Sequence, residues 1–123
     1  GAHPDGAPLG IPANAETKQW RIKAHAAFDP LWGREDTSID DYERKDRRYA
    51  AYRWLASKLG IEDVKRDCHI GRFNIEQCQQ VIAACEGVTW RDIDIWHRGW
   101  KATRNYQQKR RHRRKRGRRN RHG

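Results

Sequence analysis

The chain has 123 residues, of which 36% are hydrophobic and 35% are charged, and its formal net charge is +11. No apolar run reaches the roughly 18 residues of a membrane span, and no secretory signal is present at the start. These features predict one cytoplasmic domain with no membrane partner.

Residues 1–13 contain three prolines and three glycines, which prevent helix formation and predict an extended lead-in. Residues 14–97 are predicted to form a helical body, because apolar side chains recur there every three or four positions. We expect its helices at about residues 15–29, 38–59, 75–85 and 90–106. The fold class predicted is all-α, a small bundle of about four helices.

Each expected helix begins at a residue type that commonly caps helices, namely Asn14, Ser38, Asn74 and Thr89. Gly60 is expected to end the second helix in a left-handed conformation. The apolar stripe of that helix is expected to include Tyr42 and Tyr49.

The positive charge is concentrated at the C-terminus. Residues 1–97 hold 14 Lys+Arg and 16 Asp+Glu, whereas residues 98–123 hold 13 Lys+Arg and no acid. Because like charges repel, this basic arm is expected to be extended until a polyanion neutralises it. Ten of the 13 cations are Arg, whose planar guanidinium suits phosphate.

The arm therefore predicts binding to nucleic acid, and both RNA and DNA remain open. Trp100 and Tyr106 near its root are expected to stack on unpaired bases. The cations expected to contact phosphates are Lys101, Arg104, Lys109, Arg110, Arg111, Arg113, Arg114, Lys115, Arg116, Arg118, Arg119 and Arg121.

Four segments together resemble a phage-encoded family of zinc-finger-containing domains of unknown function. They read PLGIPANAE, KAHAAFDPLW, YAAYRWLASKLGI and DCHIGRFNIEQCQQVI, and the resemblance extends from residue 1 to about residue 85. It implies a nucleic-acid setting in the cytoplasm of a phage host and names no reaction.

The resemblance also implies a four-cysteine zinc ribbon just before the PLGIPANAE segment, and those cysteines are absent. The chain has no Met and begins at Gly1, so we expect that an N-terminal segment is missing. Zinc is expected only in that segment, and no cofactor or metal is expected in this chain.

The cysteines and one histidine of the body have structural interpretations. Cys78 and Cys85 are seven residues apart on an apolar helix face, too far to share one ion, so they are expected in the core. Cys68 and His69 are adjacent, which makes their side chains diverge. His69 is expected to bond a nearby carbonyl or a helix end rather than act as a base.

Two other function classes remain as alternatives. Trp90, Trp96 and Trp100 would form an exposed aromatic patch in a protein-interaction module or an inhibitor of a host or phage machine. Asp92, Asp94 and Glu86 would hold Mg²⁺ in a metal-dependent nuclease. The first two acids point in different directions around a helix, which disfavours the nuclease and leaves no expected catalytic residue.

Overall fold

The computed structural model describes the backbone of residues 13–121 and the side chains of residues 14–113. The described chain is helical without strands, which confirms the all-α bundle. The elements are α1 (Ala13–Phe28), the 3-10 helix η1 (Asp29–Trp32), α2 (Asp41–Leu59), α3 (Val64–Asp67), the 3-10 helix η2 (Ile70–Arg72), α4 (Ile75–Cys85) and α5 (Trp90–Arg121). The predicted lead-in lies outside the described residues except for Ala13, which is already helical.

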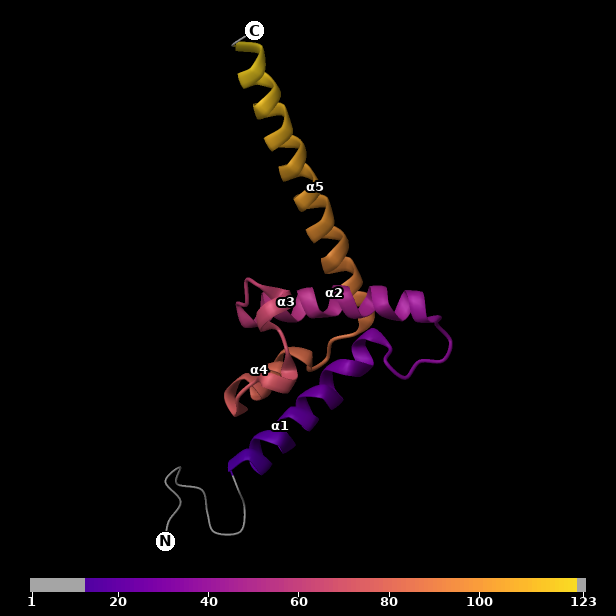
Figure 1. Cartoon of the computed structure of the whole chain (residues 1–123). Helices are drawn as coiled ribbons and strands as arrows, with labels where there is room; N and C mark the ends of the chain where they lie inside the picture. Colours follow the sequence, from indigo (N-terminus) through magenta and orange to yellow (C-terminus); the bar gives the residue numbers. More distant parts are fainter. Residues whose placement is uncertain (1–12, 122–123) are drawn as a thin grey trace.

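The helices α1, α2 and α4 enclose one core, and α5 leaves the body from beside α2 (Figure 1). Phe28 of α1 is fully buried, and its ring meets the ring of Tyr52 of α2 edge-on at 4.8 Å. The other buried hydrophobic residues are Ala24, Trp32, Ala50, Ala51, Trp54, Leu55, Ala56, Cys68, Ile70, Phe73, Cys78, Val81, Cys85 and Ile93.

Two predicted helix ends are confirmed. Asn74 accepts a hydrogen bond from the Gln77 N–H at 2.8 Å, and the Gln77 side chain accepts one from the Asn74 N–H at 3.0 Å. These bonds satisfy backbone donors that the first turn of α4 leaves unpaired. Gly60 ends α2 with a φ of 72°, which is the left-handed conformation that glycine tolerates best.

Two predicted N-caps are wrong. Asp40, not Ser38, caps α2 by accepting a hydrogen bond from the Glu43 N–H at 2.7 Å. Ser38 instead donates its hydroxyl and its N–H to Asp36 Oδ1 within the preceding loop. Because α1 begins at Ala13, Asn14 lies inside the helix rather than before it.

The predicted burial of Tyr42 and Tyr49 is also wrong, since they are 83% and 49% exposed. All the buried residues of α2 lie between Ala50 and Ala56. The first half of α2, which contains Tyr42, therefore extends past the core.

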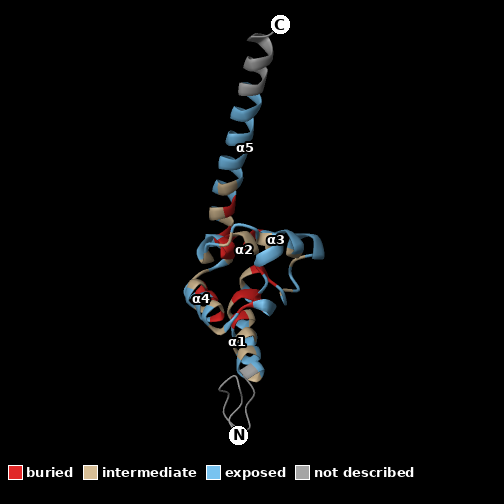
Figure 2. Cartoon of the chain, turned by 60° about the vertical axis from the view of Figure 1, so that its left-hand side comes forward, coloured by how far each residue is buried: buried red, intermediate tan, exposed pale blue. Residues whose placement is uncertain are grey.

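The basic arm is helical rather than extended. The helix that was expected to end near Tyr106 continues to Arg121 as α5 and projects from the body (Figure 2). Ala, Arg, Lys and Gln favour helix, and no proline follows Pro30 in the sequence. These local preferences act against the repulsion between like charges.

Across residues 13–121, we find no helix that combines the length and the hydrophobicity needed to cross a lipid bilayer.

Gly99 and Gly60 provide a matched test of this fold, because a Cβ added at either position would meet no atom within 4 Å. Gly99 lies inside α5, so Gly99→Ala should raise the free energy of unfolding by up to about 1 kcal/mol. Gly60→Ala should lower the free energy of unfolding, because its positive φ strains any L side chain. Urea unfolding followed by circular dichroism measures both changes, and a stabilising Gly60→Ala would contradict the described end of α2.

Candidate nucleic-acid interface

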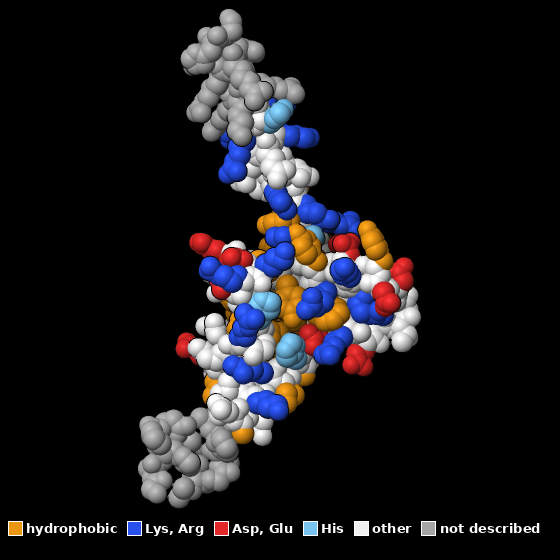
Figure 3. All heavy atoms as spheres, viewed as in Figure 1, with side chains coloured by type: hydrophobic (Ala, Val, Ile, Leu, Met, Phe, Trp, Pro, Cys, Tyr) orange, Lys and Arg blue, Asp and Glu red, His pale blue; other side chains and the backbone are white. Residues whose placement is uncertain are grey.

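The cations predicted to bind nucleic acid lie along the outer part of α5, where Figure 3 shows Lys and Arg side chains above the body. Those with described side chains are all exposed, namely Lys101, Arg104, Lys109, Arg110, Arg111 and Arg113. The backbone of α5 continues to its last turn, but six predicted side chains lie outside the described ones: Arg114, Lys115, Arg116, Arg118, Arg119 and Arg121.

The described cations surround α5 rather than forming one stripe. Successive residues of an α-helix are about 100° apart, so Lys109, Arg110 and Arg111 already cover about 200° of the circumference. Lys101 lies close to the middle of the remaining arc. A partner could therefore meet positive charge on any side of this helix.

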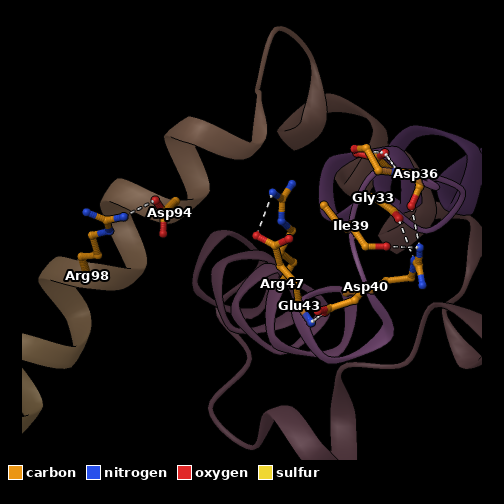
Figure 4. Close-up of polar contacts among 10 residues, drawn as sticks. Gly33, Asp36, Ile39, Asp40, Glu43, Arg47, Asp94 and Arg98 are labelled. Carbon is orange, nitrogen blue, oxygen red and sulfur yellow. Dashed lines mark hydrogen bonds and ion pairs between the residues drawn. The ribbon is translucent and has the colours of Figure 1, made fainter.

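The acids of α5 lie only in its first turns, and each has a partner. Asp92 Oδ2 accepts hydrogen bonds from the N–H and the hydroxyl of Thr89, which lowers the pKa of Asp92 and confirms the predicted cap. Asp94 pairs with Arg98 at 3.0 Å (Figure 4). These positions serve the helix end, and the structure does not gather Asp92, Asp94 and Glu86 into a cluster that could hold Mg²⁺.

Rings and guanidinium groups hold α5 on α2. The rings of His97 and Trp100 stack at 5.4 Å with an interplanar angle of 10°. The Arg53 guanidinium of α2 lies 4.2 Å from the centre of the Tyr49 ring and 4.5 Å from that of Trp100. Arg104 lies over the same Trp100 ring at 5.4 Å. These five residues form what we call the aromatic junction, which cation–π attraction stabilises.

The aromatic junction changes what the two predicted stacking residues can do. The Trp100 ring already contacts His97, Arg53 and Arg104, so a base would reach it only by displacing one of them. Tyr106 is 61% exposed and remains accessible to a base.

The tryptophans expected to form the exposed aromatic patch of a protein-interaction module are partly covered. Trp90, Trp96 and Trp100 are all half-buried. Arg47 lies over the Trp90 ring at 5.0 Å, and Trp96 stacks against His97 at 6.2 Å. Because polar side chains cover these rings, this surface lacks the large apolar area typical of a docking site.

Arg44 of α2 forms hydrogen bonds within the protein. Its guanidinium donates to the carbonyls of Gly33, Asp36 and Ile39, which are labelled in Figure 4, at 3.1, 2.5 and 3.2 Å. Arg44 therefore fixes the loop before α2 rather than facing a ligand.

Two other arginines on α2 differ in how their charge is compensated. Arg47 pairs with Glu43 at 3.3 Å (Figure 4). Arg48 is exposed and takes part in none of the ion pairs among the described side chains. Arg48 therefore keeps an uncompensated positive charge on the body.

The described residues do not fit a zinc ion. Among them no three His, Cys, Asp or Glu side chains lie close enough together to hold a metal. Cys68, Cys78 and Cys85 are buried free thiols, which confirms the prediction for Cys78 and Cys85. Burial raises the pKa of Cys68 and of Cys85 to about 11, so both remain protonated, whereas zinc binds the thiolate. His69 Nε2 lies 2.6 Å from the Lys65 carbonyl oxygen, as predicted.

A family of zinc-finger-containing domains matches residues 1–88, and the chain therefore belongs to this family. The match ends just before α5, so the basic helix lies outside the part of the chain that the family describes. No curated protein and no solved structure matches the chain.

Arg53 was not among the predicted site residues, although the aromatic junction depends on it. Tyr49 and Arg53 are four residues apart, which places them on one face of α2. That spacing indicates a ring–guanidinium contact within α2, but the approach of Trp100 from α5 depends on tertiary packing.

His97 should make stability depend on pH. Burial, Lys101 and Arg53 lower the pKa of His97 below 6.5, while Asp46 and Asp94 act in the opposite direction. As the pH falls below 6.5, the unfolded chain takes up a proton that folded His97 resists, so the free energy of unfolding should decrease.

Urea unfolding on either side of pH 6.5 measures this decrease. His97→Phe keeps a ring in the aromatic junction and should weaken the pH dependence. A pH dependence that His97→Phe leaves unchanged would contradict the role given to His97.

The buried thiols should react slowly with a disulfide reagent in the folded protein, because burial raises the pKa of all three, to about 11 for Cys68 and Cys85, and little thiolate forms. Unfolding in guanidinium should release three fast-reacting thiols. A chelator should leave the native rate unchanged, because burial protects these groups. Fast reaction after chelation alone would instead show that a metal ion protects them.

Proposed function

We propose that this protein binds RNA or DNA through α5, whose Lys and Arg side chains contact phosphates. The observation that carries the proposal is the placement of 13 cations and no acid in residues 98–123, on a helix whose described outer cations are all exposed. Such a surface releases the condensed counterions of a nucleic acid, which drives binding.

Phosphates would also stabilise α5 itself. Lys109 and Arg113 are four residues apart on the helix, and like charges at this spacing destabilise a helix by about 0.2–0.5 kcal/mol per pair. A phosphate bound between two such side chains replaces the repulsion between the two cations with one attractive contact to each of them. Binding and helix formation in the arm therefore favour each other.

The distribution of charge around α5 favours binding within a groove. A helix lying on a flat surface would use cations on one side only, whereas a helix in a groove has phosphates along both walls. The major groove of B-DNA admits an α-helix, and a distorted RNA helix offers a comparable channel to an Arg-rich segment. Lys109, Arg110 and Arg111 point in three directions and suit such surroundings.

The family to which residues 1–88 belong also supports the proposal, because zinc-finger-containing domains are compatible with nucleic-acid binding. The resemblance to phage-encoded members and the three free thiols support a location in the host cytoplasm.

The proposal predicts a steep dependence of affinity on salt. Replacing Lys109, Arg110, Arg111 and Arg113 by Gln together should make the slope of log K against log salt shallower by about three to four on duplex DNA. Filter binding over a range of salt concentrations measures this slope.

The matched control replaces Lys18, Lys45, Lys58 and Lys65 by Gln, which removes the same number of exposed cations from the body. The slope should then change by less than about one. Equal changes in the two variants, or binding by the unmodified protein that does not respond to salt, would refute the proposal.

A further inference from the structure

A hollow of about 1080 Å³ lies where the end of α1, η1, α2 and the first residue of α5 meet. Its volume slightly exceeds the usual range for small-molecule sites, which leaves room for a nucleobase. Figure 3 shows hydrophobic side chains on this face of the body, with Lys and Arg side chains around them. The hollow is part of neither the predicted site nor the aromatic junction.

Aromatic rings and guanidinium planes line this hollow together. The rings belong to Trp32, Tyr52 and Trp90. The Arg48 guanidinium lies 4.9 Å from the Tyr52 ring centre and 5.8 Å from that of Trp32, and Arg47 lies over Trp90. Because these guanidinium groups already lie over the rings and Trp32 is buried, an unpaired base would stack on a guanidinium plane, as bases do in other nucleic-acid-binding proteins.

Three acids also line the hollow, and two of them are engaged within the fold. Asp29 Oδ2 accepts from Arg34 at 2.9 Å and lies 3.2 Å from His25 Nδ1. Asp36 accepts the hydrogen bonds from Ser38. Glu35 is exposed, where its carboxylate could accept from the amino group of a base.

One of the arginines that line the hollow has a positive charge that is available to an anion. Arg34 forms an ion pair with Asp29, and Arg47 forms one with Glu43. Arg48 has no carboxylate partner among the described residues. Arg48 is exposed, and its guanidinium lies over the rings of Trp32 and Tyr52 and interacts with the Tyr52 hydroxyl. An anion at this position would therefore replace no existing ion pair.

The hollow is connected to the proposed phosphate-binding helix. Trp90 is the first residue of α5, and Arg48 precedes Arg53 of the aromatic junction by five residues on α2. Arg53 and Arg104 share the Trp100 ring, and Arg104 begins the exposed cations beyond it. The hollow therefore reaches the start of the helix that carries these cations through Trp90.

From these observations we infer that the hollow holds an unpaired base of the strand whose phosphates α5 binds, with Arg48 contacting the phosphate beside that base. This inference rests on the proposed function and adds a preference for nucleic acids that contain a single-stranded segment. The stacked base and the helix-bound phosphates then act as two contacts on one ligand.

The test compares three DNA probes by filter binding to the full chain. The first is a short blunt duplex, the second is that duplex with a single-stranded thymidine overhang, and the third is a longer blunt duplex with as many phosphates as the second. The protein should bind the overhang probe about tenfold more tightly than the third probe, a difference that lies within the range expected for the stacking of one base.

Arg48→Gln should remove this preference and change the affinity for blunt duplex by less than about threefold, because one charge among many is lost. Arg48→Lys should retain only part of the preference for the overhang, because Lys keeps the positive charge but lacks the planar guanidinium group. Lys45→Gln is the matched control: Lys45 is exposed on the same helix and does not line the hollow, so the preference should persist.

The outcomes separate the two proposals. Salt-dependent binding of blunt duplex without any preference for the overhang would overturn the assignment of the hollow and leave the role of α5 standing. An overhang preference that survives Arg48→Gln, or that Lys45→Gln reduces equally, would overturn the assignment as well. Failure of the unmodified protein to bind any probe in a salt-dependent way would overturn both.

Discussion

Beside the buried Ile93, the attachment of α5 to α2 depends on a guanidinium group that lies over aromatic rings instead of pairing with an acid. Arg53 of α2 lies over Tyr49 and over Trp100 of α5, and the rings of Tyr49 and His97 meet edge-on. A salt bridge at this place would cancel the positive charge of Arg53. A cation–π contact leaves that charge intact, so Arg53 attaches the helix and adds to its attraction for phosphate.

The body and α5 differ in their balance of charges. In the body, Arg44, Arg47 and Arg34 are bound to carboxylates or carbonyls, whereas Arg48 has no carboxylate partner among the described residues. In α5 the last carboxylate is that of Asp94. The family match covers residues 1–88, so the near-neutral body belongs to the family and the basic helix lies outside the match.

Sequence periodicity was sufficient for the helical class, and residue type was sufficient for the cap at Asn74, because both depend on neighbours within one helix turn. The exposure of Tyr42 could not be predicted, since it depends on where other elements stop covering α2. The cations of α5 were evident from composition alone. Arg48 and the hollow beside it were not, because their arrangement arises from four elements that meet only in the folded chain.

The continuity of α5 has a mechanical consequence. Its 32 residues make a rod of about 48 Å, of which about 25 Å lies beyond Arg104. A rod without a proline or a break behaves as a lever that turns about its base. A tilt of about 10° at the rings of His97 and Trp100 would displace the far end by about 6 Å. Slight repacking there would redirect the axis of any strand bound along the rod.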